Sequence, residues 1–258
     1  METIPSLRPL LILTGFGPFH GVTDNPSMCI INELTSSGFA ERLPGFEVML
    51  RTLEVSVEHC HDFYDQLAAA TTAESDGYSN SGDEDYITRP TLIVHVGVDG
   101  GAQTIKLEQT AYNDMTFRCA DERGFQPLGQ SIDPKKAFNA PSSSALPLSA
   151  VCDKLNATEG CAGMVALSQD AGRFLCNYTY YKALSFLEGR AAQHSGGDMG
   201  TRSSSGGVSA ADSRGSAVFV HVPPFEVLSQ PLQVALVENI VLSLASAFHG
   251  ATSTHGKT

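Results

Sequence analysis

Short apolar segments alternate with helix-like segments along the chain. Five stretches have the length and apolar character of strands, at 10–14, 47–53, 91–98, 163–167 and 217–222. Apolar residues at spacings of three and four predict helices over 27–36, 57–73, 148–156, 174–187 and 230–248. The segment 104–113 has extended character, whereas 113–147 is rich in turn residues. This alternation predicts an α/β layer structure with a mainly parallel sheet.

Two polar segments and a polar tail lie outside this pattern. Residues 74–89 carry five acidic side chains among Ser, Gly and Asn, which predicts an acidic surface loop insertion. Residues 189–215 are rich in Gly and Ser and predict a long flexible insertion, and residues 250–258 are polar. We therefore expect a single domain over 1–258 that carries these additions.

Charge and composition narrow the possible partners. The 258 residues have a net charge of −12, which argues against nucleic acid or an anionic membrane as the main partner. No run of about 18 apolar residues occurs, so we expect no membrane span, and the first residues lack the features of a signal peptide. None of the six cysteines forms a CxxC pair, so reduced thiols in the cytoplasm are the simplest account.

Cys176 is a candidate nucleophile because of its position in the pattern. It falls in the first turns of the helix that follows the apolar run 163–167. Free N–H groups and the helix dipole at such a position favour the thiolate, which is the reactive form. Most buried cysteines only pack against their neighbours, so a catalytic role needs further residues with matching chemistry.

Two other residues supply that chemistry. His221 ends an apolar strand just before Pro223-Pro224 and could serve as a general base, or it could be a buried histidine satisfied by backbone groups. Glu108 follows Lys106 in an otherwise uncharged stretch and could orient His221, or it could lie on an exposed strand edge. Both residues and Cys176 lie at or just after candidate strands, where α/β sheets bind ligands, so we expect them to meet.

Two other motifs could indicate a phosphate-binding loop and a metal site, and the sequence disfavours both. The Gly15–Phe19 loop follows the first strand, but Pro18 removes a backbone donor and no helix follows directly, so a phosphate loop is disfavoured. Its two phenylalanines would suit either the wall of an apolar pocket or a hydrophobic plug. The Glu58–Asp62 stretch contains two histidines, but adjacent helical positions diverge, so a solvated face is expected and no metal site.

Three groups of residues resemble the pyroglutamyl peptidase I family of cysteine peptidases, in order and at similar spacing, over roughly 10–224. They are Thr14-Gly15-Phe16-Gly17-Pro18-Phe19 with Asn25-Pro26-Ser27, Leu107-Glu108 through Ala111-Tyr112-Asn113, and Asp170-Ala171-Gly172-Arg173-Phe174-Leu175-Cys176-Asn177 with Phe219-Val220-His221-Val222-Pro223. The chain differs from the family pattern at Val98, where bacterial members often carry Gln, and at Glu54, where members usually carry Pro.

The resemblance implies a single three-layer α/β/α domain with a twisted, mainly parallel mixed sheet. It implies that Cys176 is the nucleophile, that His221 is the general base and acid, and that Glu108 orients His221. It also implies that Arg118 lies beside the oxyanion region. The residues that it assigns to the substrate pocket are Phe16, Phe19, Asn25, Phe174 and Leu175.

The implied activity is that of a cysteine-type omega peptidase, which removes an N-terminal pyroglutamyl residue from peptides by thiolate acyl transfer and thioester hydrolysis, without a metal or organic cofactor. Two alternatives stay open: another cysteine-dependent amidase for a small acyl group, and an inactive module that binds pyroglutamyl peptides. A nucleotide-binding enzyme is a distant third. The oligomeric state also stays open, because bacterial relatives form tetramers and the two insertions would interfere with such packing.

Overall fold

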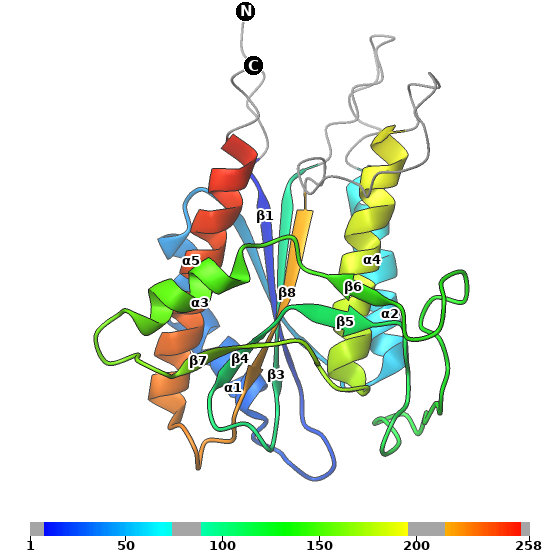
Figure 1. The fold of residues 1–258 in the computed structure, drawn as a ribbon, viewed down its shortest axis with the longest axis horizontal. Coiled ribbons are helices and arrows are strands. Elements are labelled where there is room, and N and C mark those ends of the chain that lie inside the picture. The colour runs from blue at the N-terminus through cyan, green and yellow to red at the C-terminus, as the bar shows by residue number, and fades with distance from the viewer. Residues whose placement is uncertain (1–7, 74–88, 196–214, 254–258) are drawn as a thin grey trace, which may run out of the picture.

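A computed structural model describes residues 8–73, 89–195 and 215–253 of the chain. At its centre is a six-stranded sheet with strand order β2-β1-β3-β8-β4-β7 (Figure 1). The strands are β1 (Leu10–Phe16), β2 (Glu47–Leu53), β3 (Thr91–Val98), β4 (Ile105–Glu108), β7 (Val165–Ser168) and β8 (Gly215–Val222). Neighbouring strands pair in parallel except β4 and β8, which are antiparallel. The predicted mixed, mainly parallel sheet is therefore confirmed.

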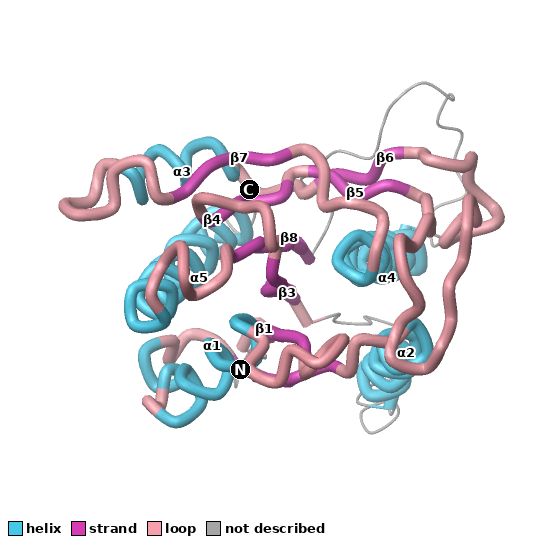
Figure 2. The backbone as a smooth tube through the Cα atoms, turned by 90° about the horizontal axis from the view of Figure 1, so that it is seen from below, coloured by secondary structure: helices cyan, strands magenta, loops and turns pink. Residues whose placement is uncertain are grey.

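Helices cover both faces of this sheet, which confirms the three-layer α/β/α architecture (Figure 2). One face is covered by α1 (Pro26–Ser36), α3 (Leu148–Asn156) and α5 (Gln230–Ser253). The other is covered by α2 (Val57–Ala73) and α4 (Leu175–Ser195). A short 3-10 helix, Phe39–Arg42, follows α1, and a two-stranded sheet of β5 (Thr110–Tyr112) and β6 (Pro141–Ser143) lies beside α4.

Alternating strand residues divide the interior into two cores. Leu11, Val94 and Val220 pack with α1, α3 and α5. Ile12 and Phe219, which point to the opposite side, pack with α2 and α4. The second face also carries the buried polar residues of the described strands, namely Thr14, Thr91, His95, Glu108 and His221. The buried polar side chains of the strands therefore lie on the side of the sheet that α2 and α4 cover.

Helix α5 is the most apolar of the described helices. Its residues Gln230–Gly250 are long and apolar enough to cross a membrane by length and composition alone. Side chains along the helix, including Val237, Ile240 and Leu244, are completely buried against the sheet. The apolar side chains of α5 therefore form part of the core of this fold.

Several boundaries differ from the sequence predictions. Helix α4 continues through Ser195, so the first seven residues of the expected insertion 189–215 are helical, in keeping with good helix formers such as Ala191 and Ala192. Helix α5 continues to Ser253, into the expected tail 250–258. Most of the expected acidic loop 74–89 lies outside the described residues. Only Arg89 is described, and it pairs with Glu47.

Candidate active site

Cys176 lies in the first turn of α4, as the sequence predicted. The chain leaves β7 at Ser168 and turns at Gly172, whose φ of +78° lies in the left-handed region that favours glycine. The Asp170 carboxylate accepts a hydrogen bond from the Gly172 N–H at 3.0 Å and so fixes this turn. The half-buried Cys176 thiol is therefore presented at a helix N-terminus immediately beyond a strand.

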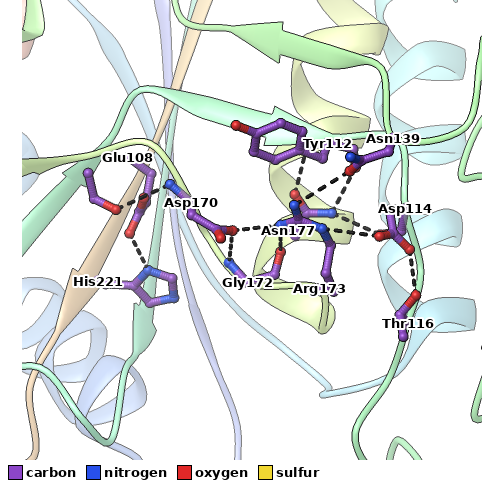
Figure 3. A network of polar contacts seen from close by, with 11 residues as sticks. Glu108, Tyr112, Asp114, Thr116, Asn139, Asp170, Gly172, Arg173, Asn177 and His221 are labelled. Carbon is purple, nitrogen blue, oxygen red and sulfur yellow. Dashed lines mark hydrogen bonds and ion pairs between the residues drawn. The ribbon is translucent and has the colours of Figure 1, made fainter. Parts of the chain in front are cut away.

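His221 and Glu108 are joined by a buried hydrogen bond (Figure 3). His221 Nδ1 lies 2.8 Å from Glu108 Oε1, and the Glu108 side chain is completely buried. The antiparallel register of β4 and β8 sets Lys106 opposite His221 and Glu108 opposite Phe219, so Glu108 is the diagonal neighbour of His221. Glu108 is therefore a core carboxylate and does not lie on an exposed strand edge.

The Cys176 side chain interacts electrostatically with His221 on the other side, so the interactions extend from carboxylate to imidazole to thiol. Gly97 of β3 lets the thiol come this close to the sheet. A Cβ at Gly97 would lie 3.2 Å from Cys176 Sγ and 2.6 Å from Phe219 Cζ. The three residues that the sequence singled out thus meet, and their arrangement is the one that thiol acyl transfer needs.

The surroundings of His221 favour its protonated form. Burial alone lowers the pKa of His221, but the Cys176 and Glu108 side chains together outweigh burial and raise it to about 10. Glu108 Oε2 is buried and has no hydrogen-bond partner among the described residues, so the hydrogen bonding of this carboxylate is directed to His221.

Asn177, the neighbour of Cys176, ties the start of α4 to the end of β5 (Figure 3). Its Oδ1 accepts from the Tyr112 N–H at 2.8 Å, and its Nδ2 donates to the carbonyl oxygens of Tyr112 and Asp114 at 2.8 and 3.0 Å. The side chain is completely buried. Sequence reasoning missed this role, because the partners are backbone groups more than sixty residues away and leave no motif.

The Arg173 side chain holds the segment that leads into α4. Its guanidinium contacts Asp114 at 3.1 Å and Asp170 at 2.6 Å, and its Cζ lies 4.3 Å from the centre of the Tyr112 ring. The Arg173 carbonyl also accepts from the Thr116 N–H. The residues just before Cys176 are therefore held on the same segment, 112–116, that Asn177 holds.

Aromatic side chains gather just before Cys176. Phe174 contacts Phe19, with ring centroids 5.2 Å apart, and Phe117, at 4.7 Å. Phe19 and Phe174 are half-buried. Phe16 and Leu175 are only 4% and 1% exposed and belong to the core on this side of the sheet. Phe117, which the sequence analysis did not single out, packs against Phe174 and extends this cluster.

The two predicted polar residues differ in their surroundings. Arg118 is exposed, and its guanidinium carbon lies 5.9 Å from the centre of the Phe174 ring. Asn25 is buried and caps α1: its Oδ1 accepts from the Ser27 N–H, and its Nδ2 donates to the Gly17 carbonyl at 2.9 Å. These contacts fix the loop that carries Phe19. The substrate roles expected for Arg118 and Asn25 stay predictions.

Comparison with known proteins is consistent with this geometry. The family model for pyroglutamyl peptidase matches residues 85–199. Human pyroglutamyl-peptidase 1 is 34% identical over 187 residues, which cover 72% of this chain and 77% of the relative. Pyrrolidone-carboxylate peptidase from Clavibacter michiganensis subsp. michiganensis is 30% identical over 191 residues, which cover 73% and 76% of the two chains.

Solved structures show the same fold. Pyrrolidone carboxyl peptidase from Thermococcus litoralis superimposes with a TM-score of 0.68 at 20% identity, over 94% of this chain and 96% of that one. Pyroglutamyl peptidase I from Bacillus amyloliquefaciens gives a TM-score of 0.66 at 21% identity, over 93% and 98%. Together with the human and bacterial relatives, these matches establish that the chain belongs to the pyroglutamyl peptidase family.

Proposed function

We propose that this protein is a cysteine-type omega peptidase that removes the N-terminal pyroglutamyl residue from peptides. The observation that carries the proposal is the contact chain from Glu108 through His221 to Cys176, at the start of α4. The human and bacterial relatives are named pyroglutamyl-peptidase 1 and pyrrolidone-carboxylate peptidase, which supports the same reaction. Peptides that begin with pyroglutamate are the corresponding substrates.

The first half of the reaction is acyl transfer to sulfur. The Cys176 thiolate attacks the carbonyl carbon between pyroglutamate and the next residue and forms a tetrahedral intermediate. Its oxyanion would be stabilised by N–H groups at the start of α4, which have no partner within the helix, and by the Arg118 region. The C–N bond then breaks, and the protonated His221 gives its proton to the leaving amine.

The second half returns the enzyme to its starting state. His221 takes a proton from water as the water oxygen attacks the thioester carbonyl. The C–S bond breaks, pyroglutamic acid leaves, and Cys176 becomes a thiolate again beside a protonated His221. Throughout, the Glu108 carboxylate holds the imidazole in place through Nδ1 and stabilises its charged form.

Selectivity for pyroglutamate follows from the lack of charge on its lactam nitrogen. The half-buried rings of Phe19 and Phe174 offer apolar surface to the flat lactam beside Cys176. An ordinary amino terminus carries an ammonium, whose transfer to such a surface without a counter-ion costs several kcal/mol. We therefore expect a substrate with a free amino terminus to be rejected.

All six cysteines lie in the described part of the chain and are unpaired, Cys176 among them. A thiol nucleophile needs a reducing environment, and we infer that the protein works in the cytoplasm.

The test is release of a fluorogenic amine from its pyroglutamyl amide under reducing conditions, with the free-glutamyl amide as control substrate. We expect wild type to cleave only the lactam substrate. Cys176→Ala and His221→Ala should lose this activity, whereas Cys161→Ala, which removes a half-buried thiol between α3 and β7, should keep it. If folded wild type cleaves neither amide, the proposal is wrong, and binding of a pyroglutamyl peptide without turnover would then identify an inactive binding module.

A further inference from the structure

An ion pair that the mechanism above does not use lies beside the catalytic histidine. Lys106 Nζ contacts Asp99 Oδ2 at 2.7 Å, and both side chains are about one-third exposed, at 34% and 33%. Lys106 is the direct cross-strand partner of His221 in the antiparallel pairing of β4 and β8, so both side chains lie on the same face of the sheet. Asp99 follows β3, and its N–H donates to the Val222 carbonyl, next to His221.

The strand order shows on which side of the Cys176 sulfur the Lys106–Asp99 ion pair lies. Across the sheet from β1 to β4 come Phe16 on β1, Gly97 on β3 under the Cys176 sulfur, His221 on β8, and Lys106 on β4. Phe16 on β1 and Phe19 in the loop after β1 lie on the β1 side of the sulfur. Because His221 gives its proton to the leaving amine, the leaving peptide departs on the β8 and β4 side, toward Lys106.

We propose that Lys106, held by Asp99, binds a carboxylate on the residue that follows pyroglutamate, and so favours pyroglutamyl dipeptides or peptides with an acidic second residue. This inference rests on the proposed function. It adds a second specificity site, for the leaving peptide, to the aromatic site for the lactam.

Hydrogen bonding makes Lys106 the partner of the substrate and leaves Asp99 in a supporting role. Asp99 Oδ1 accepts from the Gly101 N–H and Oδ2 from Lys106, so both of its oxygens are engaged. An ammonium has three donors, and within the described part of the chain Lys106 uses one of them, on Asp99. The hydrogen bond to Asp99 also raises the pKa of Lys106, which keeps the ammonium charged at neutral pH.

The experiment measures kcat/KM for pyroglutamyl-alanine, its C-terminal amide, and the α-amide of pyroglutamyl-glutamate, whose one carboxylate is that of the glutamate side chain. The readout is the ratio of each carboxylate substrate to the neutral amide. In Lys106→Met we expect this ratio to fall about three- to tenfold, as for loss of a partly exposed charge-assisted hydrogen bond. Lys106→Arg should keep most of it. Lys154→Met, on α3 over the other face of the sheet, is the matched control and should not change it.

The three arms distinguish the outcomes. A fall only for pyroglutamyl-alanine assigns the site to a terminal carboxylate, and a fall for the glutamate α-amide extends it to acidic side chains. An unchanged ratio, or an equal loss on all three substrates, overturns the proposal while leaving the peptidase function intact. Cleavage of no substrate by wild type overturns both.

The salt dependence of wild type gives a second test that needs no variant. The ratio of kcat/KM for a carboxylate substrate to kcat/KM for the neutral amide should shrink between 0.05 and 0.5 M NaCl, roughly as charge screening predicts. A constant ratio would contradict the site.

Discussion

His221 is held between a carboxylate and a thiol on a sheet face that is otherwise mostly apolar. Burial opposes its charge, and the neighbouring Glu108 and Cys176 favour it more strongly. The three side chains were visible in the sequence because each carries chemistry at a strand end or a helix start. What the sequence did not show is how close they come, since this distance depends on Gly97 and Phe219, whose roles exist only in the assembled sheet.

Replacing Glu108 tests the electrostatic account of His221. In Glu108→Gln the hydrogen bond to Nδ1 loses its negative charge, so the pKa of His221 falls from its raised value. The alkaline limb of the kcat/KM profile, where His221 loses its proton, should move to lower pH, and kcat should drop by about 10²-fold. The matched control is Glu188→Gln, at an exposed carboxylate on α4. An unshifted alkaline limb would show that Glu108 does not set the pKa of His221.

Replacing Gly97 tests whether its lack of a side chain lets Cys176 and Phe219 pack close to the sheet. The new Cβ in Gly97→Ala would overlap Phe219 and press on the Cys176 sulfur, so we expect a loss of about 1–3 kcal/mol in the free energy of unfolding and a lower kcat. Gly100→Ala, three residues later, meets no atom within 4 Å and should stay within about 0.5 kcal/mol of wild type. Urea unfolding and kcat report both effects, and equal behaviour of the two variants would refute the packing argument.

At the scale of elements, Cys176 is positioned by α4, and α4 is tied to β5 by Asn177 and Arg173. The pattern of apolar residues predicted α4 and most other elements well, because 3.6-residue and two-residue periodicities are local properties of the chain. It could not predict β6 in the turn-rich stretch 113–147 or the attachment of α4 to β5, since both depend on partners distant in sequence.

Two asparagines with the same bonding pattern separate stability from catalysis. Asn177 pairs with the backbone of Tyr112, and Asn156, at the end of α3, pairs in the same way with the N–H and C=O of Val165. Each change to Ala leaves backbone groups unsatisfied and should lower the free energy of unfolding by about 2 kcal/mol.

Only Asn177→Ala should also lower kcat, by about tenfold or more, because it frees the start of the helix that carries Cys176. Unfolding curves and single-substrate kinetics on both variants make the comparison. A similar kcat for the two would mean that this tie stabilises the fold without positioning the nucleophile.

At the scale of the molecule, one sheet face holds two buried histidines in opposite states. His95 lies between Thr14 and Tyr64, with 2.6 Å hydrogen bonds to each hydroxyl, and burial lowers its pKa to about 3. His221 has a raised pKa instead. The pattern of apolar residues indicated that β3 and β8 are buried, but it did not indicate that one histidine is neutral and the other protonated. Nor did it reveal that β4 runs antiparallel to β8, because a short extended segment carries no direction.

The two histidines predict a stability maximum near neutral pH. Neutral His95 contributes stability that is present above about pH 6.5 and lost as the pH falls toward 3, because the unfolded chain binds a proton that the folded one does not. The contribution of His221 is present below pH 6.5 and lost as the pH rises toward about 10.

Unfolding free energies measured across pH should therefore fall on both sides of neutrality. His95→Gln should reduce the acid slope by about 1.4 kcal/mol per pH unit, the value for one proton. An unchanged acid slope in this variant would show that His95 is not the group responsible.

The place of β8 in the sheet has a consequence for how the enzyme is made. Of the strands that the structure describes, β8 is the last to be synthesised, yet it lies between β3 and β4 and joins the two parts of the sheet. A nascent chain that ends before residue 215 already contains the thiol and the carboxylate but has no strand to hold them in line. Since the same strand brings His221, closure of the sheet and assembly of the proposed catalytic site become one event, and a half-made chain is unable to act on the peptides around it.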